Sequence, residues 1–107
     1  MKPLSPVLAA LLLVGCSSGP APLSTRQACD ELAPIVKEFG QVQPDAARFA
    51  AYAPKVRAVV DRSDESTRKV LEPYAAAFAG GNIWTLAGAS VAAQGVCVGA
   101  GSTGWAR

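Results

Sequence analysis

The 107-residue chain contains no histidine. Histidine is the commonest general base near neutral pH and the commonest zinc ligand, so its absence excludes Ser-His-Asp and Cys-His nucleophiles and the usual zinc sites. The chain also lacks an excess of charge, with 10 basic and 8 acidic residues. A nearly balanced charge creates no field that attracts phosphates, so we expect no nucleic-acid partner.

Clustered carboxylates are scarce as well. Only Asp30-Glu31 and the group Asp61, Asp64 and Glu65 lie close together in the sequence. The first pair falls in an early turn of an expected helix and the second group around an expected helix start, and acidic residues are common there because they interact favourably with the helix dipole. The sequence therefore predicts no catalytic residue, no metal ligand and no cofactor site, and an enzyme would require a concave polar pocket that these residues do not suggest.

Long hydrophobic runs are missing from the first part of the chain. Residues 7–14 form a run of eight apolar residues behind Lys2, whereas a transmembrane helix needs about 20. A short apolar run behind a positive charge is typical of a signal peptide. The segment Ser17-Ser18-Gly19-Pro20-Ala21-Pro22 then has the composition of a flexible tether.

The run ends in Leu13-Val14-Gly15-Cys16, which resembles the lipobox of bacterial lipoprotein signal peptides. The resemblance implies that Cys16 receives a diacylglyceryl group, with chains such as palmitate, and becomes the first mature residue. Residues 1–15 are then the signal peptide, 16–23 a lipidated tether and 24–107 an extracytoplasmic domain at the cell membrane. Two acyl chains suffice for stable anchoring. The alternative is an ordinary secretory signal in which Cys16 is incidental.

Two cysteines remain, Cys29 and Cys97. An even number of cysteines in an exported protein indicates a disulfide bond, although two free buried thiols are the alternative. A bridge would close a loop of 68 residues, and the chain-entropy account gives it about 4 kcal/mol of stabilisation. A domain of this size has little core, so the bridge is expected to matter.

Apolar residues recur at helical spacing through most of the remaining chain. A capping box at Ser24 and Gln27 indicates a helix start, and Gly40 and Gly80-Gly81 indicate helix ends. We therefore predict an all-α fold, a small four-helix bundle with one disulfide and an irregular tail. Its helices are expected at residues 24–39, about 44–62, about 63–80 and about 83–98.

A proline lies inside each of the first three predicted helices, at Pro34, Pro54 and Pro73. An interior proline removes a hydrogen bond and kinks or breaks a helix. The sequence leaves open whether these helices are bent or whether each proline starts a new helix. The similar surroundings of the three prolines could reflect a degenerate repeat, but chance in an Ala- and Pro-rich chain explains them better.

Residues 73–106 contain no charged side chain. We interpret residues 83–98 as the central helix, surrounded by the others; a membrane span over 83–101 is the alternative, weakened by its glycines and polar residues. Trp84 is expected to pack at the start of this helix. Trp105 either plugs the open end of the bundle or forms an exposed contact with a partner.

The lipobox, the tether, the helical domain and the two distant cysteines together resemble the small Ala-rich lipoproteins of actinobacteria and their phages. The resemblance implies a lipid-anchored binding module of the cell envelope, held to the membrane through Cys16 and interacting with an envelope protein. The alternative is a phage-derived superinfection-exclusion lipoprotein that blocks DNA entry. Neither function is enzymatic.

Overall fold

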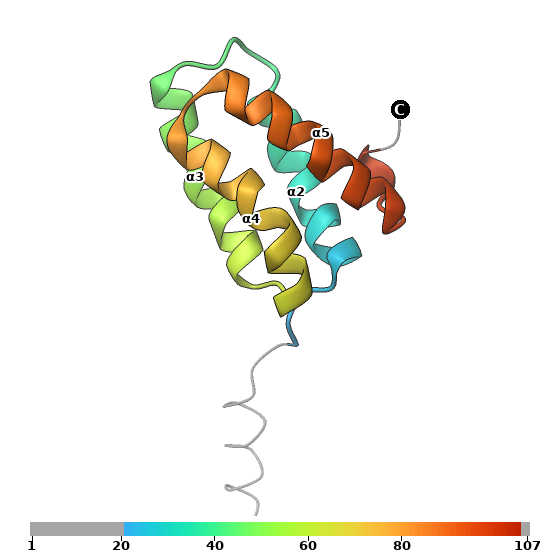
Figure 1. Ribbon diagram of the computed structural model, residues 1–107. Coiled ribbons are helices and arrows are strands. Elements are labelled where there is room, and N and C mark those ends of the chain that lie inside the picture. The colour runs from blue at the N-terminus through green and yellow to red at the C-terminus, as the bar shows by residue number, and fades with distance from the viewer. Residues whose placement is uncertain (1–20, 106–107) are drawn as a thin grey trace, which may run out of the picture.

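The computed structural model describes residues 21–105 and shows four α-helices (Figure 1). Within that range it contains no strand beyond a single bridge between Leu23 and Ser63, so the all-α prediction is confirmed. The predicted signal peptide and the lipidation site Cys16 lie outside the described residues. The elements are α2 (Thr25–Phe39), α3 (Ala46–Asp61), α4 (Glu65–Gly80), α5 (Ile83–Gly99) and a short 3-10 helix, η1 (Thr103–Trp105).

Local sequence signals determine where the helices begin and end. The predicted capping box is present, with Ser24 and Gln27 exchanging hydrogen bonds at the start of α2. Asp45 and Asp64 cap α3 and α4, each accepting a hydrogen bond from the backbone amide three residues later. Gly81 follows α4 with φ of 69°, a left-handed conformation that glycine adopts without strain.

Helices α2, α3 and α4 share an aromatic core. The ring of Phe39 packs edge-to-face against Phe49, Tyr52 and Phe78, with ring centroids 4.9 to 5.5 Å apart. Tyr74 continues the cluster at 5.3 Å from Phe78. Edge-to-face packing adds to the hydrophobic gain of burying these rings, so the aromatic cluster holds the three helices together.

The three prolines lie inside continuous helices, at Pro34 in α2, Pro54 in α3 and Pro73 in α4. They do not start new helices, which resolves the alternative that the sequence left open. All three are exposed. A proline has no N–H to donate to the carbonyl four residues earlier, and on the solvent side water can bond to that carbonyl instead. Such a proline favours a bend around the core.

The predicted disulfide joins α2 to α5. Cys29 and Cys97 are bonded, their Cα atoms are 5.5 Å apart, and neither residue is accessible to solvent. The bridge therefore fixes which side of α5 faces the bundle.

Helix α5 is not the central helix, so that prediction is wrong. Only Leu86, Ala93 and Cys97 are buried on α5, whereas α4 buries six residues and contacts all three other helices. Helix α5 lies across α4 and α2 with one side only (Figure 1). The absence of charge was the misleading signal, because alanine, glycine, serine and threonine are as compatible with an exposed face as with a buried one.

Among residues 21–105, no helix is both long enough and apolar enough to cross a membrane.

Candidate interaction surface

Helix α5 carries most of the exposed large hydrophobic side chains among residues 21–105. Trp84 is 82% exposed, Val91 73%, Val98 47% and Ile83 45%. Only two other large hydrophobic residues within residues 21–105 are comparably exposed, Val42 and Val70. We call the side of α5 formed by Trp84, Val91 and Val98 and the small residues between them the α5 face; Ile83, about 100° from Trp84 around the helix, lies at its border.

The disulfide explains why Trp84 points outward. Residues 86, 93 and 97 lie on one side of α5, because steps of seven and four residues return to the same side of a helix. Two residues correspond to about 200° of rotation, so Trp84 lies opposite the buried Leu86. The prediction that Trp84 packs at the start of the helix is therefore wrong.

Large and small residues alternate along the α5 face. Trp84, Val91 and Val98 are spaced by seven, with Gly88 and Gly95 between them at steps of four and three. A Cβ atom at either glycine would meet nothing within 4 Å. The α5 face is therefore a row of protruding apolar side chains separated by open gaps, and no charged residue lies on α5.

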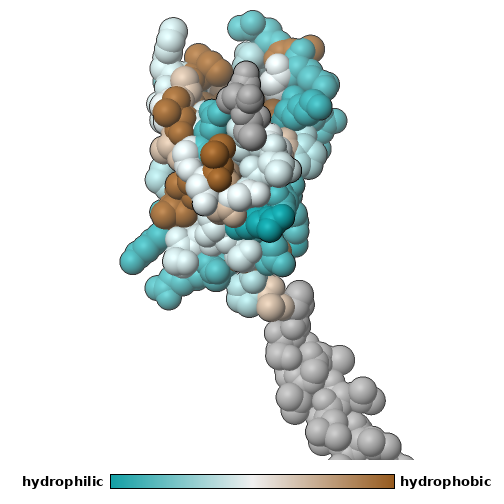
Figure 2. All heavy atoms as spheres, turned by 90° about the vertical axis from the view of Figure 1, so that its right-hand side faces the viewer, coloured by the Kyte–Doolittle hydropathy of each residue, from teal (hydrophilic) through white to brown (hydrophobic). Residues whose placement is uncertain are grey.

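Figure 2 looks from the side of the molecule on which α5 ends. Hydrophobic groups gather in the upper left of this view, while most hydrophilic groups lie to the right and below. On this face of the molecule the apolar groups are thus unevenly distributed. Contiguous apolar patches are often interaction sites, which makes the α5 face the candidate surface of the described residues.

Two roles were considered for Trp105, a plug of the bundle's end and an exposed contact, and the structure shows it packed at the end of the bundle. Its side chain is 9% exposed, and its ring lies 6.2 Å from that of Tyr74. Its indole Nε1 donates a hydrogen bond of 2.8 Å to the carbonyl oxygen of Cys29. Ser102 supports the same turn, because its hydroxyl donates to a carboxylate oxygen of Asp30 at 2.6 Å. Trp105 closes the end of the bundle beside the bridge.

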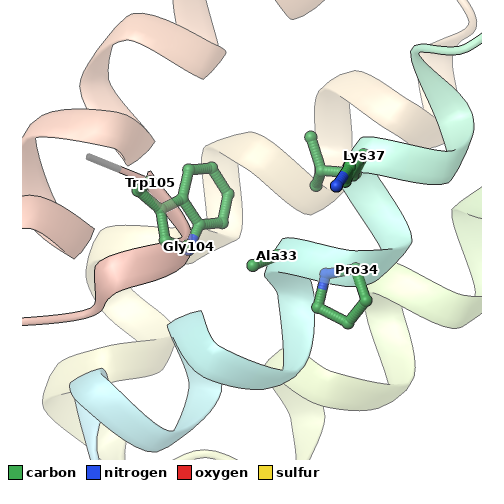
Figure 3. A pocket seen from close by; sticks show the side chains of 6 residues that line it. Ala33, Pro34, Lys37, Gly104 and Trp105 are labelled. Carbon is green, nitrogen blue, oxygen red and sulfur yellow. The ribbon is translucent and has the colours of Figure 1, made fainter. Parts of the chain in front are cut away.

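A shallow pocket of about 410 Å³ lies next to this tryptophan, between α2 and η1 (Figure 3). Its walls are mainly apolar, and Lys37 is the one charged residue that lines it. The backbone comes very close here, since a Cβ atom on Gly104 would lie 2.5 Å from the Cβ of Ala33. Apart from the Lys37 amine, the lining offers no nucleophile and no carboxylate, so the pocket has the character of an apolar depression.

The predicted carboxylate clusters are not brought together into a site. Asp30 binds Ser102, and Glu31 pairs with Arg62 of α3's C-terminal cap. Asp64 caps α4, where hydrogen bonds from Thr67 lower the pKa of its carboxyl. Asp61 pairs with Arg57 at 3.5 Å, so four of the five carboxylates in these clusters have a local structural partner.

The remaining ion pairs lie on exposed surfaces of the helices. Arg57 donates two hydrogen bonds to Glu72, at 2.7 and 2.8 Å, which lower the pKa of Glu72 and raise that of Arg57.

Burial raises the pKa of Tyr74 to about 12, so its hydroxyl is protonated at neutral pH. Across residues 21–105 no three metal-ligating side chains come together.

The described body is therefore a small disulfide-linked four-helix bundle with one uncharged, exposed helix face. Comparison of the chain with protein-family models, with curated proteins and with solved structures finds no match. The α5 face was not predicted, although the sequence contains the residue that indicates it, Cys97. Because Cys97 points inward, it fixes the rotation of α5 about its own axis. At 100° per residue, Trp84, Val91 and Val98 then lie on the outside.

Proposed function

We propose that the protein is a lipid-anchored module of the cell envelope, attached through Cys16 on the extracytoplasmic side, that acts by binding another envelope protein through the α5 face. The observation that carries the binding role is the exposure of Trp84, Val91 and Val98 on a helix without charge. The anchor rests on the resemblance of Leu13-Val14-Gly15-Cys16 to a lipobox.

Exposed apolar area gives the driving force for binding. Taking about 200 Å² for a tryptophan side chain and about 100 Å² for an aliphatic one, the three large side chains of the α5 face and the bordering Ile83 expose about 330 Å². At about 25 cal/mol per Å², covering this area is worth about 8 kcal/mol before the costs of association. Tryptophan is also among the residues most often found at the centre of binding hot spots.

The attachment point of the tether supports the same assignment. Leu23 is hydrogen bonded to the loop between α3 and α4, through Arg62 O and Asp64 N, both at 2.9 Å. Helix α4 starts there and runs for about 24 Å, at 1.5 Å per residue, before α5 begins at its far end. An anchor at Cys16 would hold one end of the bundle and leave Trp84 near the opposite end, available to a partner (Figure 1).

Metabolic labelling tests the anchor. Cells that express the full chain are fed a radiolabelled fatty acid, and the protein is compared with its Cys16→Ala variant. We expect label in the parent protein and none in the variant, because the variant lacks the thiol that is acylated. Label that persists in Cys16→Ala, or that never enters the parent, would refute the anchor.

A capture experiment tests the binding role. Intact cells are treated with a cross-linker, and tagged full-length protein is purified with whatever is attached to it. We expect Val98→Asp to lose the captured protein and Val70→Asp to retain it. The two valines are matched, 47% and 46% exposed, but Val70 lies on α4. Equal capture by both variants would show that the α5 face is not the binding surface.

A further inference from the structure

We infer that residues 101–105 form a lid that controls reduction of the bridge between Cys29 and Cys97. A thiol reaches the sulfurs when this lid opens locally, while α2, α3 and α4 stay folded, and reduction then releases α5 from α2. The inference goes beyond the proposed function and does not depend on it, because it concerns only contacts within residues 21–105.

The bridge is closed to solvent in the folded protein. Neither Cys29 nor Cys97 is accessible, whereas thiol–disulfide exchange requires that an attacking thiolate approach one of the two sulfurs. Some part of the body must therefore move before a reductant in solution can break the bridge.

The lid is bonded to both halves of the bridge. The chain turns back after α5 at Gly101, whose φ of 90° is left-handed, and Ser102 N then donates a hydrogen bond of 3.0 Å to the carbonyl oxygen of Cys97. The indole Nε1 of Trp105 donates to the carbonyl oxygen of Cys29 at 2.8 Å. The lid thus crosses from α5 to α2 at the position of the bridge.

The lid is also the smallest of the elements around the bridge. It buries only Ser102 and Trp105, and its other side-chain bonds join Ser102 to Asp30 and Gln94 to the carbonyl oxygen of Trp105. Helices α2 and α5 are joined covalently by the bridge itself, and α4 buries six residues. Because short segments with few buried contacts open at a lower free energy than a whole bundle, the lid is the part that moves first.

Reduction through the open lid follows ordinary exchange with a dithiol. One thiolate of the dithiol attacks a sulfur of the bridge, the bond between the two sulfurs breaks, and the other cysteine leaves as a thiolate that takes up a proton. The second thiolate of the dithiol then displaces the first cysteine from the mixed disulfide, and that cysteine also takes up a proton. The dithiol is oxidised to a disulfide, and the protein holds two thiols.

The urea dependence of the reduction rate tests the inference. The full chain carries Cys16→Ala, so that Cys29 and Cys97 are its only cysteines. It is mixed with dithiothreitol, in the range where the rate is proportional to the concentration of dithiothreitol, and alkylated at intervals. Mass spectrometry then gives the fraction of chains that have gained two alkyl groups.

Local opening and global unfolding predict different results. Opening of the lid exposes little surface, so we expect the rate to rise less than about twofold over the first 1 M urea, whereas reduction through global unfolding would rise about fivefold or more. The comparison is made below the midpoint of urea unfolding, where the bundle is folded.

Two substitutions separate the lid from the core. Trp105→Ala removes the side chain that holds the lid closed. Val56→Ala makes a space in the core at α3, which contacts neither α5 nor η1. We expect Trp105→Ala to accelerate reduction at least about tenfold. Val56→Ala should change the rate less than about twofold, although it lowers the midpoint of urea unfolding.

Trp105→Phe keeps the test decisive if Trp105→Ala does not fold. Phenylalanine retains an aromatic ring but cannot donate a hydrogen bond to the carbonyl oxygen of Cys29, so reduction should accelerate about threefold or more while the far-ultraviolet circular dichroism stays unchanged. A steep urea dependence in the parent chain, equal acceleration by Trp105→Phe and Val56→Ala, or no acceleration by Trp105→Phe would overturn the lid.

Discussion

Breaking the bridge between Cys29 and Cys97 is the change whose effect can be worked out most fully. The bridge can be removed chemically with reductant or genetically with the double substitution Cys29→Ala and Cys97→Ala. Both sulfurs are inaccessible to solvent, so the double variant loses the covalent link and leaves only a small space. A single substitution would leave a free thiol and is the poorer experiment.

The expected loss is about 4 kcal/mol, from a sequence separation of 68 residues and the entropy that the bridge removes from the unfolded chain. Single domains of this size have total stabilities of about 5–15 kcal/mol. The loss should fall first on α5, because α5 buries only Leu86, Ala93 and Cys97 against the bundle. The aromatic core of α2, α3 and α4 does not depend on the bridge.

Urea unfolding followed by circular dichroism measures the total effect, and amide hydrogen exchange locates it. With a slope of about 1–3 kcal/mol per M, the midpoint should fall by at least about 1 M. Exchange should accelerate most in α5 and η1. A loss below about 1 kcal/mol, or exchange that accelerates equally in all four helices, would contradict the view that the bridge is what holds α5 in place.

Three further predictions concern the described body. Gly104→Ala should destabilise it by about 1–3 kcal/mol, because the added methyl group collides with Ala33, whereas Gly80→Ala, with open space around it, should not destabilise it; urea unfolding compares them. Asn82→Ala should cost about 1 kcal/mol and speed amide exchange only in the first turn of α5, since Asn82 accepts hydrogen bonds from two backbone amides there. The pKa of Tyr74 is raised by burial to about 12 against an ordinary value near 10, so its stabilisation is complete below pH 10 and is lost as the pH rises towards 12. This loss amounts to about 2–3 kcal/mol of unfolding free energy. When unfolding free energy is measured against pH, Tyr74→Phe should lack it, and a variant with the same alkaline pH dependence as the parent would contradict the assignment.

The parts of the fold that could be predicted from the sequence are those set by local chemistry. Ser24, Asp64 and Asn82 mark helix starts because their side chains bond to free backbone amides, and such bonds need no tertiary contact. The bridge followed from the parity of the cysteines. Whether Pro34, Pro54 and Pro73 bend or break their helices could not be predicted, because burial elsewhere on each helix decides whether the cost of an interior proline is offset.

The placement of α5 failed for a different reason. Periodicity predicts the buried side of a helix only where apolar and polar residues occupy different sides. Helix α5 consists largely of small residues that are neither strongly apolar nor strongly polar. The sequence therefore gives no direct indication of whether Trp84 and Trp105 face the core or the solvent. Once Cys97 is known to face Cys29, the rotation of α5 is fixed, Trp84 becomes exposed, and the tail folds back so that Trp105 covers the bridge.

Site-specific photo-crosslinking in intact cells tests the central claim, that this protein acts by binding through the α5 face. A photoreactive amino acid is placed at Val91 in the full chain, and at the exposed Val70 of α4 in a control. Irradiation should give a discrete covalent adduct from position 91 and none from position 70. No adduct at position 91, or the same adduct from both positions, would contradict the account.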